Sequence, residues 1–329
     1  MAQEYADNLF VDKNRQFVQP VAGLKNLILD LQEVNGRLPD RDKYVMYVEE
    51  IIKDFSKLKY LLPSKVDEFK AKYDGILKDD KLSATIKRRK RILPKDKKDR
   101  KGLHEYAVPF YDEIVYRMHY EDVRPYLGKY MKQIGLNTCV YCNNAKATVS
   151  VERNEVYYPF DHSKPKDKYP FLCISFFNLY PCCTNCNGHK LNDPEKAFQI
   201  YVEKEPLRDP FVFGIERKNM VYGEPKSIKV VFSSRNIADN DLAEDYNRSY
   251  RITAFYNSED EQRSSYKMLK DIERYRASYS DATEASLKLK VNRKELFQEV
   301  LGVDDDESNI FTDVNKKLKL DTAKDAKLI

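Results

Sequence analysis

The stretch NLYPCCTNCNGHK at residues 178–190, preceded by CVYC at residues 139–142, decides how the middle of this chain folds. Each stretch contains a CxxC motif, and a gap of two residues lets both sulfurs of a tight turn reach one ion. Four thiolates suit tetrahedral Zn²⁺, at Zn–S distances of about 2.3 Å. The pattern therefore predicts a closed, structural zinc site whose ligands are Cys139, Cys142, Cys183 and Cys186.

Two further cysteines and two other interpretations bear on this site. Four buried cysteines without an ion are less expected than a zinc site, and nothing around the motifs resembles a thioredoxin-like redox unit. Cys182 could replace Cys183, but only Cys183 leaves two residues before Cys186. Cys173 has no evident partner, so we expect it in the core.

The chain has no long apolar run, and its polar N-terminal residues lack the apolar centre of a signal peptide. We therefore expect a cytoplasmic protein without a membrane segment. A reducing compartment favours metal ligation over disulfides for paired CxxC motifs.

The insert between the two motifs, residues 143–182, is longer than in a simple zinc ribbon and must fold as a structure of its own. Residues 146–151 and 155–160 are typical of two short strands. Asp161 and His162 follow the second strand, and neighbouring strand residues point to opposite faces unless the strand ends or bends there.

Asp161, His162, Asn178 and Asn187 each have an ordinary interpretation, as part of a surface turn or as a helix cap. Their joint spacing inside a zinc clamp favours a catalytic site instead. Mg²⁺ prefers hard oxygen ligands and keeps several waters. The protein therefore needs to supply only one carboxylate and one amide oxygen as ligands. A neutral His, with a pKa near 6.5, is suited to taking a proton from water near pH 7.

Taken together, these motifs resemble the HNH, or ββα-metal, endonucleases. The order CxxC, DH, NLxxxCxxCNxxK of that family is complete here, as CVYC (139–142), FDH (160–162) and NLYPCCTNCNGHK (178–190). The resemblance implies an α+β chain with a small central ββα-metal unit that hydrolyses phosphodiester bonds of DNA.

The resemblance also implies a role for each residue of the pattern. His162 matches the general base that activates water, and Asp161 and Asn187 match the residues that hold a catalytic Mg²⁺ or Mn²⁺. Asn178 matches the asparagine that braces the loop and orients the base. His189 could serve as a ligand if Asn187 does not.

Over a wider stretch, residues 120–215, the chain resembles bacterial stand-alone HNH defence nucleases such as the nuclease subunit of the Septu anti-phage system. Such proteins commonly operate beside an ATPase. This resemblance implies a role against phage DNA and an ATPase partner encoded nearby.

We expect three regions, with largely helical flanks: a helical N-terminal region at residues 1–134, the nuclease unit at residues 135–198, and a mixed, possible partner-binding region at residues 199–329. Residues 104–133 are expected to be helical. An earlier helix is predicted by apolar residues at helical spacing, ended by Pro63: Val45, Val48, Ile52, Phe55 and Leu58.

A basic run, KRRKRILPKDKKDRK at residues 87–101, is expected to form a loop or a helix end because it contains Pro94. It is either a solvated linker or a patch that contacts phosphates. The proposed contacts within it are Lys87, Arg88, Arg89, Lys90 and Arg91. The HNH resemblance gives Lys190 a position that either contacts phosphate or supports the helix. The acidic residues 304–307 and the Lys-rich tail are expected to lie in solvent.

Charged residues make up 34% of the chain and the net charge is +5, which is compatible with nucleic acid but does not indicate it. Two alternatives stay open: an effector that cleaves RNA, and a zinc-stabilised protein that binds nucleic acid without cutting it. Asp161 and His162 favour an enzyme, since binding alone needs neither a carboxylate beside phosphate nor a base. The sequence leaves the oligomeric state open.

Overall fold

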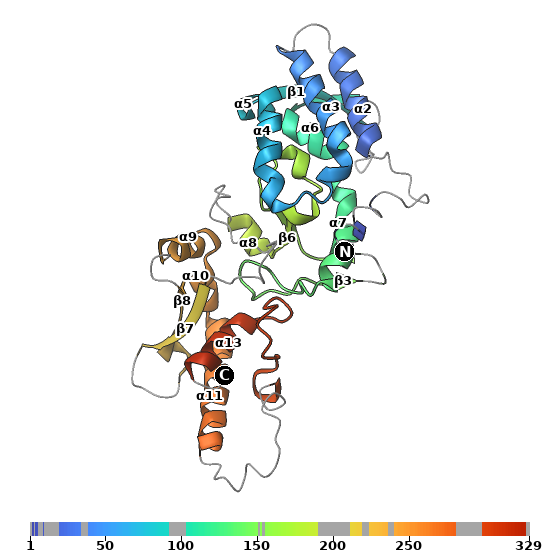
Figure 1. Ribbon diagram of the computed structural model, residues 1–329. Coiled ribbons are helices and arrows are strands. Elements are labelled where there is room, and N and C mark those ends of the chain that lie inside the picture. The colour runs from blue at the N-terminus through green and yellow to red at the C-terminus, as the bar shows by residue number, and fades with distance from the viewer. Residues whose placement is uncertain are drawn as a thin grey trace, which may run out of the picture. The chain divides into compact units, whose positions relative to one another are not determined.

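The computed structural model describes most of the chain, namely residues 2, 4–5, 9, 20–33, 39–91, 103–150, 152, 155–189, 211–218, 224–235, 240–280 and 298–326. These residues form a helix-rich chain with small two-stranded sheets, which agrees with the mixed α and β composition predicted above (Figure 1). The chain divides into two compact units. The first comprises Met1–Tyr130, Ser150–Val156 and Phe160–Tyr180, and the second comprises Met131–Val149, Tyr157–Pro159 and Pro181–Ile329.

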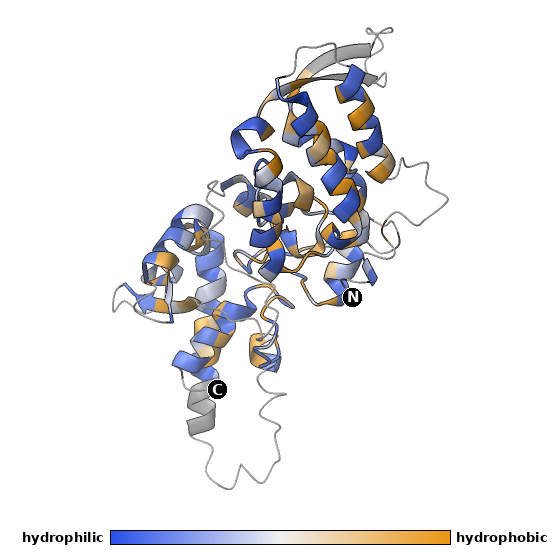
Figure 2. Ribbon diagram, turned by 45° about the horizontal axis from the view of Figure 1, so that its top comes forward, coloured by the Kyte–Doolittle hydropathy of each residue, from blue (hydrophilic) through white to orange (hydrophobic). Residues whose placement is uncertain are grey.

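Amphipathic helices build most of the first unit, and Figure 2 shows hydrophilic and hydrophobic residues on each of them. Their bounds are α2 (Pro20–Glu33), α3 (Arg41–Leu58), the 3-10 turn η1 (Pro63–Lys65), α4 (Val66–Ile76), α5 (Asp79–Leu82), α6 (Phe110–Arg117) and α7 (Tyr120–Gln133). Pro63 occupies the first position of η1, so the predicted stop after the α3 segment is confirmed. Gly23 lets α2 and α6 approach closely, because a Cβ there would lie 2.5 Å from the Arg117 carbonyl oxygen.

The basic run departs from its prediction. Residues Thr85–Arg91 form strand β1, which pairs antiparallel with β2 (Leu103–Pro109), so the loop expected from residue 87 and the helix expected from residue 104 were wrong at these positions. A two-stranded ribbon has two edge strands, where long charged side chains are well tolerated. Residues 92–102 lie outside the described residues.

Aromatic rings fill the core of the first unit and join the helices to the loop that follows β5. Tyr47 packs against Tyr73, with ring centroids 5.2 Å apart, and Tyr73 stacks on Phe171 at 4.2 Å. The amide of Phe176 donates to the Lys59 carbonyl at 2.9 Å. The N-terminal helices are therefore part of the same packed body as residues 160–180.

The middle of the chain contains four very short strands. They are β3 (Val149–Ser150), which pairs with β4 (Glu155–Val156), and β5 (Phe160–His162), which pairs with β6 (Leu179–Pro181). The two 3-10 turns η2 (Pro170–Leu172) and η3 (Phe176–Asn178) lie between β5 and β6, and helix α8 (Thr184–His189) follows. The two predicted strands are thus shorter than expected, and the second is divided into β4 and β5.

The second unit combines an antiparallel pair with helices. Strands β7 (Phe211–Arg217) and β8 (Ile228–Ser234) pair in full register, and η5 (Pro225–Ser227), α9 (Asn240–Tyr250), α10 (Ile252–Tyr256), α11 (Glu259–Ser280) and α13 (Lys316–Asp325) complete the unit. Phe213 of β7 packs against Tyr256 of α10, with ring centroids 4.8 Å apart. A separate apolar cluster joins α11 and α13 through Ile272, Leu301, Val303, Leu320 and Ala323.

The expected solvent exposure of the C-terminal charges is only partly correct. Asp305, Asp306 and Glu307 are exposed as expected, but Lys316 is only 1% exposed and Lys317 only 5%. Both buried ammonium groups have carboxylate partners, which compensate for the loss of water. No helix among the described residues is long and apolar enough to cross a membrane.

Candidate functional site

Four cysteines of the second unit come together as the CxxC spacing predicts. Their sulfur atoms all lie within 4.8 Å of one another, and the Sγ atoms of Cys142 and Cys183 are 4.0 Å apart. Tetrahedral zinc–sulfur geometry at a bond length of 2.3 Å places neighbouring sulfurs about 3.8 Å apart. Among the residues that the structure describes, this is the one group of three or more His, Cys, Asp or Glu side chains able to hold a metal ion, and its donor set fits Zn²⁺.

Backbone amides shape both knuckles of this cluster. In the first knuckle, residues 139–142, the amide of Asn144 points to the Cys142 sulfur at 3.5 Å, and in the second the amide of Cys186 points to the Cys183 sulfur at 3.4 Å. Asn143 turns the chain with a φ of 52°, a left-handed conformation that Asn tolerates better than most residues. N–H groups directed at sulfur favour the thiolate that a metal requires.

The four thiols are electrostatically coupled. Burial raises the pKa of Cys139, and hydrogen bonds from Cys139 and Cys142 lower the pKa of Cys183. Hydrogen bonding with the other three cysteines of the cluster, Cys139 first, raises the pKa of Cys186. Four thiolates in one buried place repel each other, so a divalent cation is what allows all of them to ionise together.

Tyrosines from α9 and α10 surround the first knuckle. The Tyr256 hydroxyl donates to the Cys142 carbonyl at 2.7 Å, and the Tyr246 hydroxyl donates to the Tyr141 carbonyl at 3.0 Å. The Tyr141 ring stacks on Tyr250 with centroids 4.2 Å apart. Burial raises the pKa values of Tyr246 and Tyr256 well above the usual value, so both remain neutral donors.

The two remaining cysteines lie outside the cluster, as predicted. The Cys182 thiol points to the Pro159 carbonyl at 3.5 Å, and Cys183 supplies the ligand atom instead. Cys173 is fully buried, with its thiol 3.6 Å from the Met118 sulfur, and burial raises its pKa. A buried, protonated thiol of this kind is a core residue.

Asp161 and His162 lie on β5 in the first unit. Asp161 is 9% exposed and His162 is half-buried. The His162 Nε2 atom is 3.0 Å from the Cys173 carbonyl oxygen, and since a carbonyl only accepts, Nε2 carries the hydrogen. In a neutral imidazole the lone pair is then on Nδ1. The Tyr120 ring packs 4.8 Å from the imidazole, and its hydroxyl donates to the Phe160 carbonyl at 3.1 Å.

Asn178 holds the loop between β5 and β6 at three points. Its Oδ1 accepts from the Lys164 amide at 2.6 Å, and its Nδ2 donates to the Leu172 carbonyl at 3.1 Å and to the Lys164 carbonyl at 3.2 Å. Its own carbonyl accepts from the Ser163 amide at 2.9 Å. The side chain is buried, so these bonds have little competition from water.

Asn187 and His189 are exposed on α8, in the second unit, one and three residues after the ligand Cys186. The structure thus groups Asp161, His162 and Asn178 in the first unit, and Asn187 and His189 with the cysteine cluster in the second. Lys190 lies outside the described residues, and Lys87–Arg91 are described as the backbone of β1.

Three contributors to these sites carry no signal in the sequence. The Cys173 carbonyl is a backbone group and leaves no residue pattern. Tyr120 lies forty-two residues before His162, in a segment whose pattern predicts only a helix. Asn143 is one of two adjacent asparagines, and its left-handed backbone conformation is not evident from the sequence.

Comparisons with known proteins give one informative similarity. No protein-family model matches the chain, and no solved structure matches it. The chain is 33% identical over 89 residues to the Septu protein PtuB of Bacillus thuringiensis. The match covers 27% of this chain and 30% of that protein, so it spans less than a third of either, and the chain is similar to a Septu protein over that stretch.

Proposed function

We propose that this protein is a metal-dependent endonuclease that hydrolyses phosphodiester bonds of DNA. The observation that carries the proposal is the pair on β5: a half-buried His162 whose Nε2–H is engaged by a backbone carbonyl, and which follows Asp161 directly in the chain. A base held in one tautomer next to a hard oxygen ligand matches what hydrolysis of a phosphodiester requires.

His162 acts as the base in this proposal. Because Nε2 donates to Cys173, the proton of the attacking water passes to Nδ1. Packing against Tyr120 limits rotation of the imidazole ring, and the bonds of Asn178 hold the loop that contains the Cys173 carbonyl. Each of these contacts keeps the base in one orientation. Holding a catalytic group in the right orientation lowers the entropic part of the reaction barrier.

Asp161 is the proposed ligand of a catalytic Mg²⁺ or Mn²⁺, and the HNH resemblance adds Asn187 as the second, with His189 as its substitute. One carboxylate and one amide oxygen suit a hard cation that keeps most of its waters. When bound, such an ion neutralises charge on the phosphate and on the leaving oxygen. In that resemblance the cysteine cluster holds a structural Zn²⁺.

The β1–β2 hairpin is the proposed arm for nucleic acid. Its first strand carries five basic residues in succession, Lys87–Arg91, and the register sets one acidic residue, Glu105, opposite them. A net positive ribbon gains affinity for DNA by releasing counterions from phosphates. A two-stranded ribbon is also narrow enough for the major groove, which is about 12 Å wide.

The similarity to the Septu protein PtuB supports a role in defence against phage. The partner that we propose, an ATPase, rests on the resemblance described in the sequence analysis. Co-purification with the product of a neighbouring ATPase gene tests the partnership. Failure of the two proteins to associate, with and without nucleotide, would contradict it.

The proposed activity is tested with supercoiled plasmid, Mg²⁺ or Mn²⁺, and EDTA in parallel reactions. Asp161→Ala is compared with Asp167→Ala, which removes a carboxylate from the loop that follows β5. We expect relaxed or linear plasmid with the wild type and Asp167→Ala, and intact plasmid with Asp161→Ala or EDTA.

Equal cleavage by Asp161→Ala would contradict the assignment of the metal ligand. Cleavage of RNA but not of plasmid would replace DNA as the substrate. Binding of plasmid without cleavage under every condition would favour a non-catalytic nucleic-acid-binding protein.

A further inference from the structure

The first knuckle of the cysteine cluster is held by a segment far along the chain. Asn143, the residue after Cys142, is buried, and its Nδ2 atom donates to the carbonyl oxygens of Ile310 at 2.9 Å and Asp313 at 3.1 Å. Its Oδ1 atom accepts from the Lys317 amide at 3.0 Å. One side chain beside a metal ligand therefore joins three points of residues 304–317, which we call the C-terminal segment.

Further bonds extend this contact on both sides of the knuckle. The Asn143 carbonyl accepts from the Asn315 amide at 2.6 Å, and the Asn144 side chain donates to the Asn315 Oδ1 at 2.9 Å. The Phe311 carbonyl accepts from the Asn137 amide at 3.0 Å and from the Thr138 hydroxyl at 3.2 Å. The C-terminal segment thus pairs with backbone before the first ligand and after the second.

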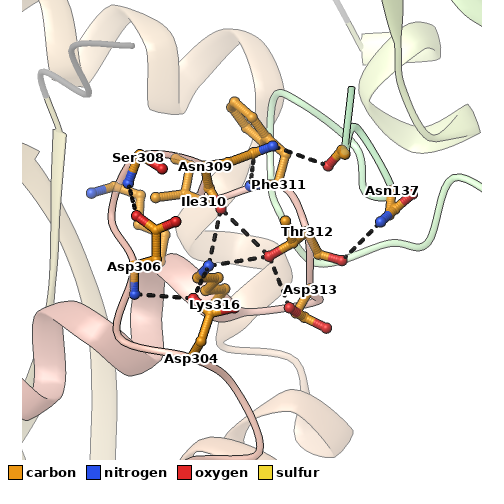
Figure 3. A network of polar contacts seen from close by, with 12 residues as sticks. Asn137, Asp304, Asp306, Ser308, Asn309, Ile310, Phe311, Thr312, Asp313 and Lys316 are labelled. Carbon is orange, nitrogen blue, oxygen red and sulfur yellow. Dashed lines mark hydrogen bonds and ion pairs between the residues drawn. The ribbon is translucent and has the colours of Figure 1, made fainter. Parts of the chain in front are cut away.

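Lys316 fixes the shape of the C-terminal segment from inside (Figure 3). Its ammonium group donates to the Asp304 carboxylate at 2.7 Å, to the Asn309 carbonyl at 3.1 Å and to the Thr312 hydroxyl at 3.1 Å. A lysine has three N–H donors, so this set uses all of them. Burial raises the pKa of Asp304, but the hydrogen bonds from Lys316 and from the Asp306 amide, together with the charge of Lys316, outweigh burial and hold that pKa below the usual value.

Gly135 shows how closely the chain just before the first knuckle packs against the C-terminal segment. Its φ is +75°, and a Cβ at this position would lie 2.6 Å from the Asn309 Nδ2 atom. That same Nδ2 atom donates to the Ile134 carbonyl at 3.1 Å. Any larger residue here would have to displace Asn309 and adopt a conformation that L-residues rarely accept.

We propose that the C-terminal segment is a structural part of the zinc site, with Asn143 and Lys316 as its positioning residues. The segment keeps the first knuckle in the conformation that presents Cys139 and Cys142, although it contributes no ligand. By linkage, zinc and the docked segment stabilise each other, so loss of either weakens the other. The proposal concerns the zinc cluster and does not depend on nuclease activity.

The first test measures zinc release from the full-length protein to a chromophoric chelator in excess. Asn143→Gly removes the side chain but keeps the left-handed turn available, and Lys316→Met removes the ammonium but keeps most of the length. Lys267→Met is the matched control, since Lys267 is exposed on α11 of the same unit.

We expect both Asn143→Gly and Lys316→Met to release zinc at least about tenfold faster than the wild type, because several ordinary hydrogen bonds together exceed the energy of a factor of ten. Lys267→Met should match the wild type. Release within twofold of the wild type by both positioning variants would overturn the proposal.

A second measurement needs no variant. Hydrogen exchange of the wild-type protein is followed by mass spectrometry before and after zinc is chelated. Peptides covering residues 304–317 should lose protection, while those covering α3 of the first unit should keep it. Equal protection of residues 304–317 with and without zinc would overturn the proposal.

Discussion

Backbone groups determine the chemistry of the side chains that matter most in this protein. The Cys173 carbonyl sets the tautomer of His162, and the amides of Asn144 and Cys186 point at the sulfurs of two cysteine ligands. Such contacts follow from how a loop or turn is folded. Zinc ligands can be predicted from the sequence because two residues between cysteines leave few geometries, whereas a carbonyl partner depends on packing along the whole loop.

The choice between adjacent cysteines gives a test at single residues. Cys183→Ser removes a sulfur from the cluster, while Cys182→Ser changes a buried thiol that only contacts the Pro159 carbonyl. We expect the purified wild type and Cys182→Ser to contain about one zinc per chain, and Cys183→Ser to contain much less. Elemental analysis checks this, and equal zinc in both variants would contradict the ligand assignment.

Among the helices, α3 shows what hydrophobic spacing can and cannot predict. The helix and its end before Pro63 were predicted, but the buried face is displaced by about one residue, because Tyr44, Tyr47 and Ile51 are buried where Val45 and Ile52 were expected. The tyrosines are buried because their rings pack against other aromatic residues and the Tyr44 hydroxyl donates to the Lys81 carbonyl at 3.2 Å. A pattern based on aliphatic residues underestimates such amphipathic rings.

The β1–β2 hairpin could not be predicted from its charges. A run of Lys and Arg with a proline after it is typical of a loop. The pairing of β1 with β2 joins residues that lie twelve to twenty-four positions apart in the chain. Strand pairing between separated residues is the kind of interaction that local sequence patterns do not contain.

The hairpin's proposed role is tested by neutralising two of its residues. Arg88→Gln with Lys90→Gln should weaken binding to a DNA duplex and reduce the slope of log affinity against log salt by roughly one for each phosphate that the variant no longer neutralises. Lys25→Gln with Lys57→Gln, on exposed positions of α2 and α3, makes the same change in charge and should leave both quantities nearly unchanged. Fluorescence anisotropy over a salt series measures both quantities. An equal weakening of DNA binding in the two variants would contradict a specific role of the hairpin in binding DNA.

At the scale of the whole molecule, the chain is divided between two units, and this division does not follow the order of the sequence. The central stretch alternates between two units, and each is completed by distant chain. In the first unit the Tyr5 hydroxyl donates to the Ile174 carbonyl at 3.0 Å. In the second the C-terminal segment binds Asn143. The CxxC motifs predicted the cysteine cluster, but interactions over more than one hundred residues leave no local pattern.

A fragment tests this dependence. Residues 135–198 contain every cysteine and the Asp161–His162 pair but lack the flanking regions. We expect this fragment to lose zinc to a chelator much faster than the full chain and to give a circular dichroism spectrum with little fixed structure. A fragment that keeps zinc as tightly as the full chain would show that the flanks are dispensable for the cluster.

The most direct measurement is the rate of plasmid cleavage by His162→Ala relative to the wild type, with Mg²⁺ present and both proteins matched for zinc content. Since His162 is proposed to take the proton of the attacking water, the rate should fall by about 10²- to 10⁴-fold. An unchanged rate in a variant that retains its zinc would contradict His162 as the base and with it the proposed mechanism.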